Sequence, residues 1–78
     1  MAIYILIEKV SEDSNYAEYT FGLNETALGK MRIEKETGKI FITEEFPDDN
    51  GFVSQRAGRK IFLHWENGEF PDKTCWAS

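Results

Sequence analysis

The first half of the chain has the hydrophobic pattern of β-strands. Residues 2–10 combine β-branched and aromatic residues without glycine or proline, which predicts a central strand covered on both faces. Residues 16–23 alternate apolar and polar positions, and this period of two predicts a strand with one buried face. The positions predicted to be buried on that strand are Ala17, Tyr19, Phe21 and Leu23.

Two further strands are predicted at residues 30–35 and 39–46. In the first, charged and apolar residues alternate, and the second has an apolar pattern rich in β-branched residues. The short connection at 36–38 ends in Gly38, which supplies a positive φ angle, so we expect a three-residue hairpin loop with a bulge at this glycine. The strand register stays open, because a shift by one residue changes the partner of Ile33. The two candidate partners are Phe41 and Ile42.

The period changes after a turn at residues 47–51. Residues 52–67 place apolar side chains three and four positions apart, which predicts an amphipathic helix. Its expected apolar face consists of Val53, Ala57, Ile61, His64 and Trp65. Asp49 or Asn50 is expected as the N-cap, and Gly68 is expected to follow the helix as the C′ residue.

This order of elements predicts a single α+β domain over residues 1–78. We expect a four-stranded antiparallel β-meander followed by one C-terminal α-helix packed on the sheet. Pro71 stops the helix, and the tail beyond it carries Cys75 and Trp76, so we expect an ordered C-terminal tail that covers the core. The second face of the first strand would be covered by this tail or by another subunit.

The composition and the charge restrict the class of protein and the kind of partner. With 41% hydrophobic, 29% charged and 14% aromatic residues, the chain has the make-up of a folded globular domain. The apolar run at residues 2–7 is too short for a signal peptide or a membrane span, which predicts a cytoplasmic protein. The net charge of −5 argues against bulk attraction to nucleic acid or to an anionic membrane, and it favours a basic protein partner.

Few residues suggest a catalytic or metal-binding site. His64 is the only histidine and Cys75 the only cysteine, so they form the one candidate nucleophile–base pair, but spacing identifies no group that would orient them. One cysteine also excludes an intramolecular disulfide and a multi-cysteine zinc site. The acidic residues fit neither an EF-hand loop nor a zinc motif. We therefore predict no catalytic residue, no metal and no cofactor.

Three segments carry a resemblance to a known class of proteins. They are GKMRIEKETGKI at residues 29–40, HWENG at 64–68 and FPDKTCWAS at 70–78. With these segments, residues 19–78 resemble small bacterial immunity proteins of contact-dependent and other polymorphic toxin systems. The resemblance implies a small cytoplasmic protein that neutralises a toxin domain by blocking its active site or an adjacent surface. Many such toxins are nucleases, whose basic clefts suit an acidic inhibitor.

The resemblance transfers no binding residue, so the candidate site is chosen by charge and expected exposure. The selected partner-binding residues are Glu44, Glu45, Phe46, Asp48, Asp49, Phe52, Arg56 and Arg59. In this hypothesis the four carboxylates cover a basic surface of the partner, and the aromatic residues add apolar contact. The alternative is a homo-oligomeric structural or accessory protein without catalytic activity, in which the apolar first strand is buried between subunits.

Overall fold

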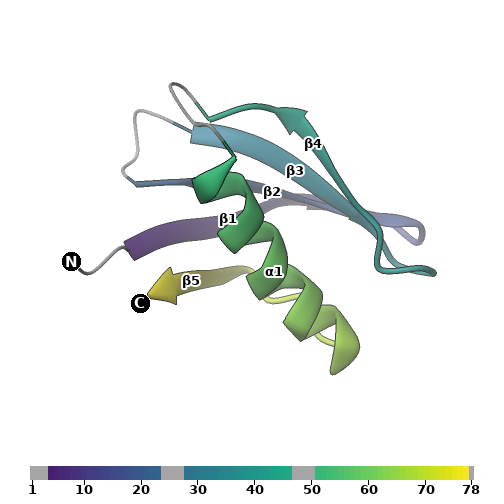
Figure 1. The fold of residues 1–78 in the computed structure, drawn as a ribbon. Helices are drawn as coiled ribbons and strands as arrows, with labels where there is room; N and C mark the ends of the chain where they lie inside the picture. Colours follow the sequence, from purple (N-terminus) through teal and green to yellow (C-terminus); the bar gives the residue numbers. More distant parts are fainter. Residues whose placement is uncertain (1–3, 24–27, 47–50, 78) are drawn as a thin grey trace.

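The fold is an antiparallel five-stranded sheet with one helix lying across one of its faces (Figure 1). The computed structural model describes residues 4–23, 28–46 and 51–77. The strands lie in the order β4-β3-β2-β1-β5. The elements are β1 (Tyr4–Glu12), β2 (Tyr16–Gly22), β3 (Leu28–Glu34), β4 (Ile40–Glu44), α1 (Phe52–Glu66) and β5 (Lys73–Ala77). The predicted α+β meander with a helix after it is confirmed.

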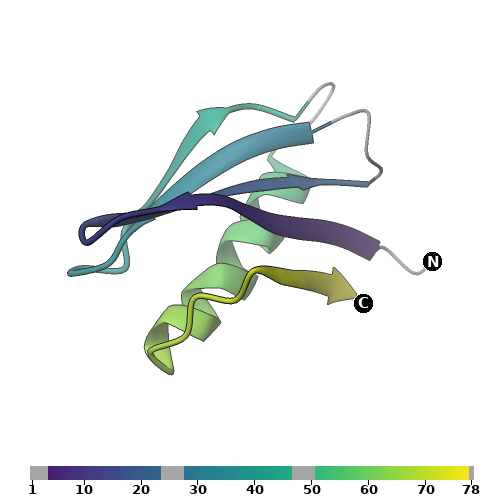
Figure 2. The ribbon, with the colours of Figure 1, turned by 180° about the vertical axis from the view of Figure 1, so that it is seen from behind.

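The C-terminal tail joins the sheet as a strand of its own. β5 runs antiparallel to β1, with Ile5 opposite Trp76 and Ile7 opposite Thr74, and Figure 2 shows the two strands side by side. β1 therefore lies between β2 and β5, inside the sheet as predicted. The tail is ordered, as expected, because it satisfies the backbone groups along an edge of β1 that would otherwise be open.

The core lies between the helix and one face of the sheet. Apolar positions at alternate residues of β1, β2 and β3 meet the buried stripe of α1. The buried residues are Ile5, Ile7, Ala17, Tyr19, Phe21, Met31, Ile33, Val53, Ala57 and Ile61. Leu23, which was predicted to be buried, is 48% exposed because β2 ends at Gly22.

The prediction that β1 is covered on both faces is wrong. Tyr4 and Val10 are 56% and 51% exposed, and no element of the described residues packs over the side of the sheet that faces away from α1. The reason is the placement of the tail, which extends the sheet instead of covering it. One face of a five-stranded sheet is thus open to solvent.

The β3–β4 connection is one residue longer than predicted. The Glu34 N–H donates to the Lys39 carbonyl over 2.8 Å, and the Gly38 N–H donates to the Glu34 carbonyl over 2.8 Å. Glu34 and Lys39 therefore lie opposite each other, and the four residues 35–38 connect them, where the sequence predicted a connection of three. Gly38 has the predicted positive φ, at 76°. A Cβ atom there would lie 2.7 Å from the Trp65 ring, so the position requires glycine for space as well.

The longer loop sets a register that neither alternative anticipated. Ile33 lies opposite Ile40, and Phe41 lies opposite Arg32. Ile40 and Ile42 consequently face the helix, whereas Phe41 lies on the open face of the sheet.

Glycines flank the helix at both ends. Gly51 is the N-cap residue at φ 98° and makes no side-chain capping bond, and the predicted caps Asp49 and Asn50 lie outside the described residues. At the other end Gly68 has φ 73° and its N–H donates to the Trp65 carbonyl over 2.9 Å. Gly68 therefore ends the helix as predicted.

A polar cluster holds the connection between α1 and β5 against the sheet. The Lys9 ammonium pairs with Glu12 and donates to the Phe70 carbonyl over 2.9 Å, and the Tyr19 hydroxyl donates to the Pro71 carbonyl over 3.1 Å. Hydrogen bonding to Glu12 raises the pKa of Lys9. Two side chains of β1 and β2 thus fix where the chain returns to the sheet.

Candidate interaction surface

The residues selected from the sequence gather where β4 ends and α1 begins. We call this region the β4–α1 corner and define it by Glu44, Glu45, Phe46, Phe52 and Arg56. Glu44 and Glu45 are exposed, and Glu44 Oε2 lies 3.9 Å from the Lys30 ammonium. Asp48 and Asp49 lie outside the described residues. Figure 1 shows the end of β4 and the first turn of α1 at the same end of the molecule.

The chain can reach this corner because Gly29 has no side chain. A Cβ atom on Gly29 would lie 2.6 Å from the Phe21 ring, 2.9 Å from the Glu44 carbonyl oxygen and 2.9 Å from the Phe46 nitrogen. The segment after β4 therefore passes directly against β3. Phe46 is half-buried and packs against the core, so it anchors the corner, whereas the sequence hypothesis treated it as an exposed aromatic.

The first turns of the helix provide an aromatic and cationic edge to the corner. The Arg56 guanidinium lies 3.5 Å from the centre of the Phe52 ring, and its Nη1 donates to the Phe52 carbonyl over 3.3 Å. This cation–π contact holds Arg56 over a ring that remains 38% exposed. Arg59 is exposed and lies seven residues after Phe52, on the same side of the helix.

A shallow groove lies between β4 and the first half of α1, next to the corner. Its volume is about 280 Å³, and its lining is Ile40, Ile42, Ser54, Gln55 and Gly58. We call it the β4–α1 groove. A Cβ atom on Gly58 would lie 3.6 Å from the Ile40 side chain, at ordinary van der Waals distance.

The β4–α1 groove borders a free strand edge. β4 is the last strand on its side of the sheet, and no described residue pairs with its outer backbone. Sequence reasoning missed Ile42 and Gly58 as site residues. The available signals were the Ile40 and Ile42 alternation and a glycine within a helical pattern.

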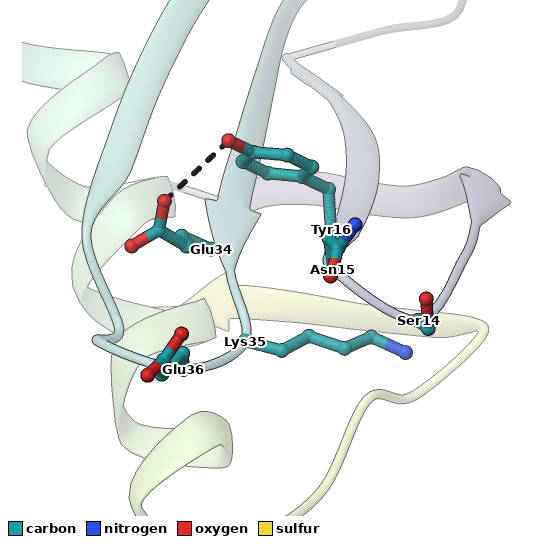
Figure 3. Close-up of a pocket in the computed structure, with 6 residues that line it drawn as sticks. All are labelled: Ser14, Asn15, Tyr16, Glu34, Lys35 and Glu36. Carbon is teal, nitrogen blue, oxygen red and sulfur yellow. Dashed lines mark hydrogen bonds between the residues drawn. The ribbon is translucent and has the colours of Figure 1, made fainter.

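A second, polar pocket of about 350 Å³ lies at the ends of the β1–β2 and β3–β4 hairpins (Figure 3). The Tyr16 hydroxyl faces Glu34 and donates to its Oε2 over 3.4 Å, and the Thr37 hydroxyl donates to Oε1 over 2.7 Å. The Lys35 side chain runs away from Glu36 and its ammonium pairs with Glu12. Glu34 and Lys35 therefore have partners within the chain, and we treat the pocket as part of the structural contacts between the two hairpins.

Hydrogen bonds from Lys35 and Lys9 lower the pKa of Glu12. The neighbouring Asp13 shapes the β1–β2 turn, since its Oδ1 accepts the N–H groups of Asn15 and Tyr16 over 2.7 and 2.8 Å. These backbone donors lower the pKa of Asp13. Both carboxylates therefore stabilise the hairpin in their ionised form.

The candidate His64–Cys75 pair is not formed. His64 Nε2 lies 3.2 Å from the Thr74 hydroxyl and its Nδ1 lies 3.1 Å from Glu69 Oε1, on the helix side of the sheet. Cys75 follows Thr74 in β5 and lies opposite Leu6, on the open face. The sheet separates the thiol from the imidazole. Within the described residues, no group of three histidine, cysteine or acidic side chains is arranged to hold a metal ion.

Comparison with protein-family models, with curated proteins and with solved structures finds no match for this chain. In residues 4–23, 28–46 and 51–77, no helix has the length and apolarity needed to span a membrane.

Proposed function

We propose that this protein is a binding protein of the immunity type, which neutralises a bacterial toxin domain by covering a basic surface on it. The observation that carries the proposal is the meeting of three features in one region. These are the exposed carboxylates of the β4–α1 corner, the apolar β4–α1 groove and the free edge of β4. The net charge of −5 favours approach to a basic partner.

Each feature supplies a different part of a protein interface. The groove offers Ile40 and Ile42 to one apolar side chain of the partner. Glu44 and Glu45 would pair with lysine or arginine at the rim, where charges contribute to the association rate and to specificity. The backbone of β4 has donors and acceptors for an extended segment of the partner.

The test uses the toxin domain encoded next to this protein. Ile42→Arg places a cation in the groove, and Leu63→Arg is its matched control, because the two side chains are 40% and 39% exposed and Leu63 lies outside both the corner and the groove. We expect Ile42→Arg to weaken binding by at least about thirtyfold, or about 2 kcal/mol. The control should bind like the parent protein in calorimetric titration.

Neutralising the carboxylates tests the charge contribution. The combined change of Glu44, Glu45, Asp48 and Asp49 to their amides should reduce protection of toxin-exposed cells and flatten the salt dependence of the association rate. The proposed surface is wrong if this variant and Ile42→Arg both fold and still protect cells as the parent protein does.

A further inference from the structure

The open face of the sheet carries a straight row of polar side chains that crosses all five strands. Its members lie directly opposite one another in neighbouring strands, in the order Lys73, Glu8, Thr20, Lys30, Glu44. We call this the charged row. Its charges read plus, minus, neutral, plus, minus from β5 to β4. The neutral centre is Thr20 in β2, the middle strand of the sheet.

An apolar row lies beside the charged row on the same face. It follows the neighbouring positions of four strands, in the order Cys75, Leu6, Gly22, Leu28. Tyr4, two residues before Leu6 in β1, is 56% exposed, and Leu28 is 37% exposed. Exposed apolar side chains that lie next to one another on one face of a protein often mark an interaction site.

We propose that the open face is the interface of a homodimer, in which two sheets pack face to face about a two-fold axis parallel to the strands. The order of charges along the charged row indicates that the partner is a second copy of the chain, and it determines the direction of the two-fold axis. Rotation about an axis along β2 reverses the row, so Lys73 meets Glu44 of the second copy and Glu8 meets Lys30 of the second copy. An in-plane axis perpendicular to the strands would instead place each charged side chain opposite the same side chain of the second copy, so that like charges meet.

The same axis matches the apolar row. Leu6 meets Leu28 of the second copy, and Gly22, which is buried between its neighbours, lies on the axis and adds no side chain there. Tyr4 adds aromatic surface next to these contacts. Aligned packing of two twisted sheets about 10 Å apart is a common way to bury such faces.

One like-charge contact falls on the axis and is compensated. Glu18 lies in β2, so the Glu18 carboxylates of the two copies approach each other. Arg32 stands opposite Glu18 in β3, and its guanidinium is held 4.6 Å from the centre of the Tyr16 ring. Two guanidinium groups therefore flank the two carboxylates.

Sedimentation equilibrium of the purified full chain tests the proposal. Between about 10 µM and about 1 mM the protein should show a reversible monomer–dimer equilibrium. Glu8→Lys sets two ammonium groups against each other across the interface, and Lys30→Glu sets two carboxylates against each other. Since symmetry changes two contacts, each variant should dissociate at least about tenfold more readily. Glu66→Lys on the helix is the matched control and should dimerise like the parent protein.

Recombining the charges distinguishes contacts between copies from contacts within one chain. An equimolar mixture of the Glu8→Lys and Lys30→Glu proteins restores both opposite-charge pairs across the interface, and so does the double variant in a homodimer. Within one chain the double variant instead places like charges beside Lys73 and Glu44. Recovery of dimerisation in the mixture supports the proposed axis.

Two results would overturn it. One is a parent protein that stays monomeric over the whole concentration range. The other is a folded double variant, judged by near-ultraviolet circular dichroism, that dissociates more readily than either single variant. Both outcomes are independent of toxin binding, because they are measured on the purified chain alone. The charged row and the β4–α1 corner share Glu44, which neither charge-reversal variant changes.

Discussion

Tyr19 couples the core to the C-terminal segment, and its ionisation should weaken the fold at alkaline pH. The side chain is fully buried, and its hydroxyl donates to the Pro71 carbonyl over 3.1 Å. Burial raises the pKa of Tyr19 from 10.0 to about 12, because the phenolate would lose its hydration inside the core. In the unfolded chain the same group loses its proton near its ordinary pKa.

The sign follows from proton binding in the two states. Below about pH 10 both states keep the proton, so the stabilisation is fully present. Between about pH 10 and about pH 12 the unfolded chain releases it while the folded protein retains it, so stability falls as pH rises. A difference of about two pKa units corresponds to about 3 kcal/mol at about 1.4 kcal/mol per unit. A domain of this length has about 4–12 kcal/mol in total.

The assay is urea unfolding of the parent protein and of Tyr19→Phe at several pH values. At about pH 7 the variant should be about 1 kcal/mol less stable, because it loses one hydrogen bond. The parent protein then loses stability as pH rises, so the gap should close and change sign near about pH 10.7. Tyr16→Phe removes the same atom from a half-exposed ring and should cost less than Tyr19→Phe at about pH 7.

A gap between the parent protein and Tyr19→Phe that stays constant from about pH 7 to about pH 11.5 would refute this reasoning. It would mean that the hydroxyl ionises alike in the folded and unfolded states. The hydroxyl would then not be sequestered under Pro71, and the described seating of the α1–β5 connection would be wrong.

Two further predictions concern the loop glycine and the last strand. Gly38→Ala should lower the free energy of unfolding, measured by urea titration, by about 2–4 kcal/mol, because alanine is strained at this positive φ and its Cβ clashes with Trp65. Gly68→Ala is the control: it has the same backbone strain but open space around the Cβ, so it should cost only about 1 kcal/mol. Equal costs for the two variants would rule out the clash. Truncation after Asp72 removes β5 and the packed Trp76 side chain. The loss of that side chain alone costs about 2–3 kcal/mol. Circular dichroism should therefore show an unfolded or strongly destabilised chain. Removal of residues 77–78 alone should be tolerated, and similar melting of the two truncated proteins would contradict the role of β5.

The sequence predicted those parts of the fold that depend on local patterns. Alternation located β2 and β3, and the change of period located α1 between Gly51 and Gly68. The tail was expected to be ordered, but its strand was not anticipated, because its five residues follow a proline closely and gain strand structure only from the free edge of β1. An apolar run such as 4–10 also does not show which of its two faces will be covered.

The candidate site was predictable in its charges and less so in its shape. Glu44 and Glu45 are exposed, as their position beside a turn suggested. Phe46 is an anchor because Gly29, seventeen positions earlier in the chain, lets its backbone pass close to β3. The groove could not be predicted, because it depends on which β4 residues face α1, and an extra loop residue before β4 set that register.

The fold separates the contacts that hold it together from the surfaces proposed to bind. The cluster of Lys9, Glu12, Tyr19 and Lys35 lies where the hairpins and the C-terminal end of α1 meet, at the opposite end of the molecule from the first turn of the helix (Figure 1). The charged side chains Glu44 and Glu45 of the β4–α1 corner and Lys73, Glu8 and Lys30 of the charged row are exposed, whereas Phe46 anchors the corner on the core. Substitutions of these charged residues remove little buried surface, so they should change binding or dimerisation with small effects on stability. The two proposed surfaces share Glu44. Ile42→Arg in the groove and Glu8→Lys in the charged row therefore test them separately in a folded protein.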